Sequence, residues 1–239
     1  PTADEFPELP LEPNSPDPQR ATATRSFLEE VQGNILSTHH RGDCVGLWLF
    51  AFAHPKAHAA NCAVVNAAAG RVTSAWEQYT IPREQSVRSL LFTGSGLLAC
   101  GALGRADGSG SFPPDLTFWL RGGMIQRTEL KAWMHDPVDS KNRPTTWEEH
   151  YTGSFDGAWL VSAPTLSDLE TRLREVREWA EPLGLKHVEY EQGRVWRPGS
   201  APVDDGAHPR KKPPAREPFG YVDGISTQHF FPLGRQNPH

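Results

Sequence analysis

Residues 44–53 read CVGLWLFAFA, an almost unbroken apolar run of strand length. Because successive side chains of a strand point to opposite sides, this run predicts a strand that is buried on both faces. Helices of the same domain can cover one of these faces. The other face then needs a second layer, which a second sheet from a repeat or from a partner chain would supply.

The rest of the chain alternates strand and helix patterns around this run. Strand patterns occur in four segments, namely 44–53, the first part of 87–100, 156–163 and 185–192. Helix patterns occur at 24–36, at 55–79, after a Gly-Ser-Gly turn in 87–100, at 123–134 and at 165–184. This order is β–α–β, a helical insertion and again β–α–β, which predicts an α+β fold of the ferredoxin-like (split βαβ) type. Its helices would cover one face of a four-stranded antiparallel sheet.

Two of the expected helices carry boundary signals. Pro55 stands at the expected first helical position of the alanine-rich helix, and Gly70 permits a break in it. Thr165 and Asp168 form a capping box at the start of the last helix, and Gly184 ends it. The apolar positions of that helix form one stripe, consisting of Leu166, Leu169, Leu173, Val176 and Ala180.

Composition shifts divide the chain into four parts. Residues 1–23 form an extended arm, whose first 20 residues hold six prolines and five acidic residues. Residues 24–196 form the ferredoxin-like domain. Residues 197–217 are a proline-rich linker with the basic run RKKPPAR, and residues 218–239 form a separate glycine-containing segment and tail. The polar arm is expected to lie on the body of the protein or on a partner.

The bulk properties exclude several classes of protein. A net charge of −5 argues against a general nucleic-acid binder, which usually has a basic balance. No run of 18 apolar residues and no signal peptide is visible, so we expect a cytoplasmic protein without a membrane span. The three cysteines, Cys44, Cys62 and Cys100, fit no zinc pattern, and Cys44 and Cys100 are expected to be buried thiols.

The segment FGYVDGIS, residues 219–226, places Asp223 beside two glycines and several aromatic residues. An Asp-Gly pair most often marks a hairpin turn. Here, however, Gly220 and Gly224 both permit the close approach of a flat ligand, and the aromatic residues would form an apolar wall. A carboxylate in such a wall is poorly solvated, which raises its pKa toward the range in which it can transfer a proton.

Three segments together resemble the dye-decolourising peroxidases (DyP-type haem peroxidases). FGYVDGIS (219–226) resembles their GxxDG signature, and EEVQGNILSTHHR (29–41) resembles a Q-G-N-I-L segment near the start of many members. FWLRGGMIQRTELKAW (118–133) is similar to a third stretch of the same domain. The three occur in order over about residues 25–230 and in the expected βαββαβ pattern, so the resemblance is stronger than GxxDG alone would give.

The resemblance implies a specific activity. Family members bind haem b between two ferredoxin-like domains that together form a barrel-like α+β structure, and they oxidise aromatic or dye substrates by one electron with hydrogen peroxide. Asp223 matches the distal aspartate, which takes a proton from hydrogen peroxide and returns it to the leaving oxygen. The residues expected to contact the haem are Gly220, Asp223, Gly224, Ile225 and Ser226.

The resemblance also implies a missing half. Family members carry the axial histidine and a distal arginine in the second domain, far beyond the motif, whereas 16 residues follow Asp223 here. The local histidines at 39, 40, 54, 58 and 229 do not match the axial position. We therefore expect no metal ligand in this chain and a partner polypeptide equivalent to the C-terminal half of the family.

Three interpretations of this missing half stay open at the level of sequence. The chain can be the N-terminal subunit of a two-chain peroxidase, a haem-free binding or structural module derived from the family, or a truncated piece. Without the resemblance, the chain would be described as a ferredoxin-like domain that binds a regulatory ligand on its sheet.

Overall fold

The computed structural model describes residues 25, 28–35, 42–80, 85–102, 134–141, 143–148, 151, 153 and 155–196. The described residues include most of the predicted ferredoxin-like domain. The arm, the stretch 118–133, the linker and the segment 218–239 lie outside them. The assignment of four parts to the chain therefore remains a prediction.

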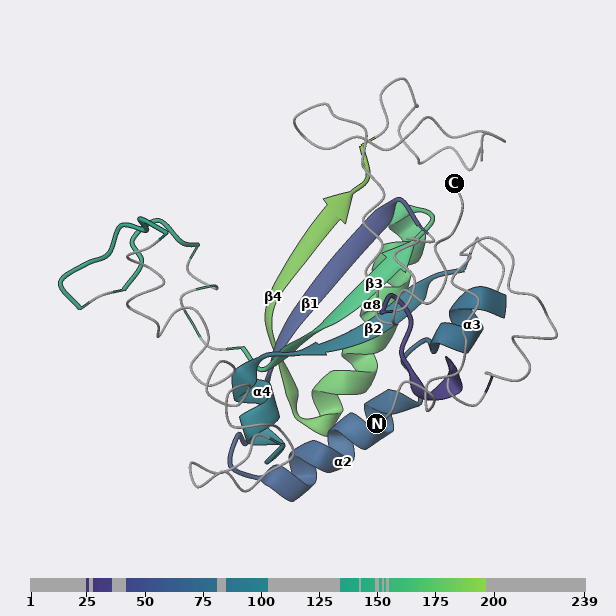
Figure 1. Cartoon of the computed structure of the whole chain (residues 1–239), viewed down its shortest axis with the longest axis horizontal. Coiled ribbons are helices and arrows are strands. Elements are labelled where there is room, and N and C mark those ends of the chain that lie inside the picture. The colour runs from purple at the N-terminus through teal and green to yellow at the C-terminus, as the bar shows by residue number, and fades with distance from the viewer. Residues whose placement is uncertain are drawn as a thin grey trace, which may run out of the picture.

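Four strands form one antiparallel sheet (Figure 1). They are β1 (Cys44–Phe52), β2 (Val87–Phe92), β3 (Gly157–Ala163) and β4 (Leu185–Arg194). Their order across the sheet is β2-β3-β1-β4, so β1 and β3 are central and β2 and β4 are the edge strands. The predicted α+β, ferredoxin-like fold is confirmed. The two strands of the first β–α–β unit, β1 and β2, have β3 between them, and the two strands of the second unit, β3 and β4, have β1 between them.

Among the described residues, two helices lie between β1 and β2, one lies between β2 and β3 and so links the two units, and one lies between β3 and β4. They are α2 (His58–Ala69), α3 (Ala75–Thr80), α4 (Gly94–Ala99) and α8 (Leu166–Ala180), and α8 continues into the short 3₁₀ turn η3 (Glu181–Leu183). Helix α8 runs along the back of the sheet in Figure 1 and contacts both central strands. None of the helices in the described ranges is long and apolar enough to cross a membrane.

The core lies between the sheet and the helices on this face. Alternate residues of β1 and β3 supply large side chains, among them Trp48, Phe50 and Trp159, and these pack with the predicted stripe of α8. Gly46 lies under that stripe, where an added Cβ would come within 2.6 Å of a Leu173 methyl carbon. The glycine therefore lets α8 approach the sheet closely.

The predicted start and end of α8 are confirmed. Thr165 accepts a hydrogen bond from the backbone N–H of Asp168 at 3.1 Å, which satisfies one of the free donors of the first turn. Gly184 follows η3 with φ of 95°, a left-handed conformation that glycine adopts without steric cost. The sequence pattern and the local backbone chemistry agree at both ends of this helix.

Two predicted boundaries are wrong. Helix α2 begins at His58 rather than at Pro55, because residues 54–57 form a separate turn in which the Ala57 N–H donates to the carbonyl of His54. The predicted Gly-Ser-Gly turn is the first turn of α4, which Thr93 caps by accepting from the Gly96 N–H. A Cβ at Gly96 would lie 1.8 Å from the Asp156 carbonyl oxygen, so this glycine serves close packing rather than a turn.

Candidate functional site

The residues predicted to act on peroxide and to contact haem lie outside the described part of the chain. They are Gly220, Asp223, Gly224, Ile225 and Ser226. Their roles remain predictions. Of the second family-like segment, 29–41, the structure describes residues 29–35. These residues lie at the outer edge of β2.

Gln32 pairs with β2 through its side chain as a neighbouring strand would through its backbone. Its Oε1 accepts from the Leu90 N–H at 3.0 Å, and its Nε2 donates to the Leu90 carbonyl at 3.2 Å. Both backbone groups of Leu90 that point away from β3 are therefore satisfied. An edge strand otherwise leaves these groups unpaired, which costs free energy where water is excluded.

Thr73 does the same for the next outward-pointing residue of β2. Its hydroxyl accepts from the Arg88 N–H at 3.0 Å, and its backbone N–H donates to the Arg88 carbonyl at 2.9 Å. Thr73 also accepts from the Gly33 N–H at 2.7 Å through its own carbonyl. The two segments that cover the edge of β2 are thus bonded to each other as well as to the strand.

Gly33 and Asn34 complete this junction. A Cβ at Gly33 would lie 3.0 Å from Gln78 Oε1 and 3.1 Å from the Thr73 carbonyl oxygen, so there is little room for a larger residue. Asn34 has φ of 65°, a left-handed conformation that Asn tolerates better than most residues. Its backbone N–H donates to Gln78 Oε1 at 2.7 Å, and its Oδ1 accepts from Gln78 Nε2 at 3.1 Å. Ser89 donates to the Gly33 carbonyl at 3.2 Å.

We call Gln32, Gly33, Asn34, Thr73 and Gln78 the edge clasp. Gln78 and Thr73 are 3% and 6% exposed. The polar side chains of the edge clasp are neutral amides and one hydroxyl, each with a hydrogen-bond partner. Such groups hold a strand in place, whereas proton transfer needs a titratable group that faces a substrate. The Q-G-N motif in this structure therefore has a positioning role.

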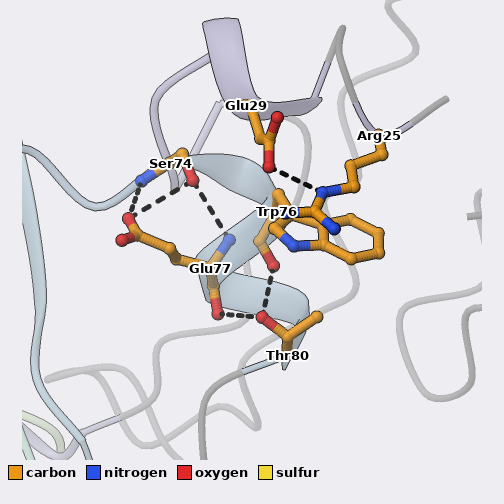
Figure 2. A network of polar contacts seen from close by, with 6 residues as sticks. All are labelled: Arg25, Glu29, Ser74, Trp76, Glu77 and Thr80. Atoms are coloured by element: carbon orange, nitrogen blue, oxygen red, sulfur yellow. Dashed lines mark hydrogen bonds and ion pairs between the residues drawn. The ribbon is translucent and has the colours of Figure 1, made fainter. Parts of the chain in front are cut away.

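A second set of contacts joins the residues before Gln32 to the start of α3, on either side of the clasp (Figure 2). Ser74 and Glu77 form a capping box at the start of α3, with Glu77 Oε2 accepting from the Ser74 N–H at 2.8 Å and Ser74 Oγ accepting from the Glu77 N–H at 3.1 Å. Arg25 pairs with Glu29 at 2.7 Å and lies 5.2 Å from the ring centre of Trp76. The helical residues before Gln32 are in this way attached to α3.

The face of the sheet turned away from α8 is also apolar. Residues of this face that are almost fully buried include Leu49, Val87 and Ala158, at 3%, 0% and 5% exposure. The expectation that the central strand is buried on both sides is met only in part for β1, because on this face Leu49 is buried whereas Val45, Leu47 and Ala51 are half-buried. Ser162 on this face is 2% exposed, and its hydroxyl has no hydrogen-bond partner among the residues that the structure describes. An apolar sheet surface with few paired polar groups is suited to pack against another apolar layer.

The described residues offer no metal site of their own. Within them, no group of three or more His, Cys, Asp and Glu side chains is placed to hold a metal ion. His54 and His58 have a spacing that can bind metal, but the His58 ring nitrogen Nδ1 lies 2.9 Å from the Ala99 carbonyl and stabilises a helix end instead. The fit of a haem group therefore depends on the predicted residues around Asp223.

Sequence reasoning found the Q-G-N motif but not the residues that bind it. Thr73, Gln78 and Ser89 carry no local signal for this role. The one available signal was the S-x-x-E pattern of Ser74 and Glu77, which marks the start of α3 and hence the position of Gln78 one turn later. That pattern does not reveal which strand edge the helix lies beside.

The sequence matches no protein-family model and no curated protein sequence. Solved structures do match. A DyP-type peroxidase (AnaPX) from Anabaena sp. has a TM-score of 0.66 at 19% identity, over 93% of this chain and 43% of that chain. DyP2 from Amycolatopsis sp. has a TM-score of 0.58 at 23% identity, over 84% of this chain and 38% of that chain. A decolorizing peroxidase from Auricularia auricula-judae has a TM-score of 0.52 at 14% identity, over 72% and 34%.

These matches establish the fold. The structural neighbours are DyP-type peroxidases, so the resemblance predicted from the three motifs is confirmed at that level. The chain spans less than half the length of the solved structures that it matches. Any peroxidase activity of this chain is therefore a proposal.

Proposed function

We propose that this chain forms the half of a DyP-type haem peroxidase that holds the distal acid–base residue, Asp223. The observation that carries the proposal is the fold match over 93% of the chain together with the GxxDG pattern at residues 220–224. Either one alone is weak, because one fold hosts many functions and a short motif recurs by chance. Their coincidence in one chain favours peroxidase activity over a binding module.

Asp223 acts in this proposal as a proton carrier. Its carboxylate accepts the proton of one oxygen of hydrogen peroxide and donates it to the other oxygen, which leaves as water. Gly220 and Gly224 would leave space for the haem beside the carboxylate, and Ile225 and Ser226 would contact it. Haem b, when bound, supplies the iron that binds hydrogen peroxide and the one-electron chemistry by which aromatic or dye-like substrates are oxidised.

The remaining part of the site is proposed to come from a polypeptide equivalent to the C-terminal half of the matched structures. That part would carry the axial histidine and the distal arginine. On this side of the sheet, Val45 and Leu47 of β1 and Leu160 of β3 are only half-buried by the chain itself, which supports a second layer of structure here. Such a layer can be a separate chain, as a hetero-oligomer, or a continuation of this one, and the mass of the native assembly distinguishes the two.

The first experiment is to purify the native assembly, record its absorption spectrum and measure the mass of every polypeptide in it. We expect a Soret band and a polypeptide that brings a second ferredoxin-like half. A homogeneous haem-free species of 26.5 kDa, without any second polypeptide, would instead support a haem-free module.

The second experiment is the variant Asp223→Asn, with Asp205→Asn in the linker as a matched control for the loss of one carboxylate. Because general acid–base catalysis contributes about 10²–10⁴-fold, we expect peroxide-dependent turnover of Asp223→Asn to fall by about 100-fold or more. The Soret band should keep its intensity in both variants. If Asp223→Asn and Asp205→Asn turn over at the same rate, Asp223 does not carry the proton.

A further inference from the structure

Three side chains from one side of α2 meet the end of α4. His58 Nδ1 lies 2.9 Å from the Ala99 carbonyl oxygen, and Asn61 Nδ2 donates to the same oxygen at 2.8 Å. Cys62 Sγ donates to the carbonyl oxygen of Cys100 at 3.0 Å. The last carbonyls of a helix have no partner within the helix, so α2 satisfies the end of α4 with its side chains.

The backbone after α4 is also fixed at this point. Gly101 adopts φ of 69°, and its N–H donates to the Leu98 carbonyl at 2.8 Å, while the Ala102 N–H donates to the Leu97 carbonyl at 2.9 Å. This is the pattern of a Schellman motif, which ends a helix at one defined residue. Cys100 therefore has a defined position relative to Cys62 on α2.

The two thiols of this junction differ from the third cysteine of the chain. Cys44 is 2% exposed and lies within the core between the sheet and α8. Cys62 and Cys100 are both only partly buried. Cys62 Sγ lies 3.0 Å from the carbonyl oxygen of Cys100 and also hydrogen-bonds with the Cys100 thiol, so the two side chains are neighbours, and both are partly exposed. The expectation that Cys100 is a buried thiol is met only in part, because Cys100 is the C-cap of α4, where it packs against the core but stays partly exposed.

We propose that Cys62 and Cys100 are a redox pair that a peroxide oxidises to a disulfide, covalently joining α2 to the end of α4. The Cys62 thiolate attacks one oxygen of hydrogen peroxide, the O–O bond breaks, and the other oxygen leaves as hydroxide, which is protonated to water. The Cys100 thiol then attacks the sulfur of the resulting sulfenic acid, its proton passes to the leaving oxygen, the S–O bond breaks, and a second water leaves. Two thiols and one peroxide thus give one disulfide and two waters.

The surroundings of Cys100 indicate which of the two thiols reacts in which step. Burial, together with the smaller effects of the charge of Cys62 and a hydrogen bond with its thiol, raises the pKa of the Cys100 thiol to about 11. Asp156, just before β3, adds a smaller effect of the same sign. Cys100 is therefore protonated at neutral pH, and we assign it the second step, as the thiol that resolves the sulfenic acid.

The pair acts independently of the proposed haem chemistry. It needs a peroxide as oxidant and a thiol reductant to reverse it, but no haem and no second polypeptide. Its product closes a loop from residue 62 to residue 100, which contains α3, β2 and α4. Closing a loop of this length restricts the unfolded chain, so the oxidised protein should be more stable than the reduced protein.

The test uses the full chain, incubated with hydrogen peroxide with and without haem, then alkylated under denaturing conditions and weighed. The reduced protein should take up three alkyl groups, one for each cysteine. The oxidised protein should take up one, on Cys44, and a peptide linking residues 62 and 100 should appear in an unreduced digest. The Tm should rise by roughly 5–10 °C and return after dithiothreitol.

Three variants make the test specific. Cys62→Ser and Cys100→Ser should each abolish the linked peptide and the rise in Tm, whereas Cys44→Ala should keep both. A disulfide that forms without haem supports the pair even if the peroxidase proposal fails. Oxidation of Cys62 to sulfinic acid without a link, a link to Cys44, or only intermolecular disulfides would overturn the proposal.

Discussion

The two edge strands of the sheet, β2 and β4, are protected by different means. The outward backbone groups of β2 at Arg88 and Leu90 are bonded to Thr73 and Gln32 of the edge clasp. Strand β4 is longer and mostly exposed, and its pairing with β1 shifts register between Leu49 and Phe50. It carries charged residues at 186, 189, 191 and 194. Charge and a bulge are common means of keeping an edge strand from pairing with other chains.

The difference shows where a single substitution can be tolerated. The edge of β2 lies beside fully buried residues such as Val87, so an unpaired backbone group there has no access to water. The edge of β4 is exposed, so water can replace any lost hydrogen bond. We therefore expect the same substitution to cost much more at the clasp than on β4, and a glutamine pair and a glycine pair allow this comparison.

The largest effect is expected for Gln32→Ala. It leaves the N–H and the carbonyl of Leu90 without their partner, and each unsatisfied buried group costs about 1–3 kcal/mol. The free energy of unfolding, measured by urea denaturation, should fall by about 2–4 kcal/mol. Gln192→Ala on β4 is the matched control, because Gln192 is exposed, and it should change stability by less than about 0.5 kcal/mol.

If Gln32→Ala and Gln192→Ala lower the free energy of unfolding equally, the hydrogen bonds of Gln32 to Leu90 add nothing to stability beyond the general effect of replacing a glutamine by alanine. A loss at Gln32 alone, with the same slope of unfolding free energy against urea, would locate the effect in the folded state. A changed slope would point to partial opening of the β2 edge.

The fold was readable from the sequence where local pattern and burial agree. The run at 44–53 predicted β1, and Thr165, Asp168 and Gly184 marked the ends of α8, because caps and periodicity involve residues within a few positions of each other. The start of α4 was missed. Its glycines suggested a turn, whereas their small size serves the approach of the Asp156 backbone, which no local pattern encodes.

The candidate site was predictable in part. The Q-G-N motif was visible, but Gln32 and Leu90 are 58 residues apart, so their pairing depends on the tertiary fold. The same holds for Cys62 and Cys100, which are 38 residues apart and fit no spacing rule. Asp223 was predicted from its motif, and its role remains a prediction.

The second largest effect is expected for Gly33→Ala. The new methyl group would lie 3.0 Å from Gln78 Oε1, 3.1 Å from the Thr73 carbonyl oxygen and 3.3 Å from a Val87 methyl carbon. Overpacking of this kind costs about 1–3 kcal/mol, because the backbone contact cannot rotate away. Gly193→Ala on β4 is the control, since nothing lies within 4 Å of its added Cβ. Its stability should be unchanged or slightly raised, as reduced freedom of the unfolded chain predicts.

A smaller effect is expected for Thr73→Val, which keeps the shape of the side chain and removes its hydroxyl. The Arg88 N–H then loses one partner, whereas Gln32→Ala removes two bonds, so the loss in urea denaturation should be about 1–2 kcal/mol. The double variant, Gln32→Ala with Thr73→Val, tests whether the two segments of the clasp stabilise the edge of β2 independently. Independent bonds predict additive losses, and a total smaller than the sum by more than about 0.5 kcal/mol indicates that removing one segment already frees the other.

The smallest effect of the clasp variants is expected on catalysis. In the proposed peroxidase, Asp223 carries the proton, and the clasp, whose side chains are neutral and fully paired, only holds the edge of β2. Turnover per haem of Gln32→Ala, measured well below its unfolding temperature, should therefore stay within about twofold of the parent, although the free energy of unfolding falls. A loss approaching that of Asp223→Asn at unchanged folded fraction would mean that the edge of β2 sets the position of the acid–base group, and the two strand edges would then differ in catalytic role as well as in stability.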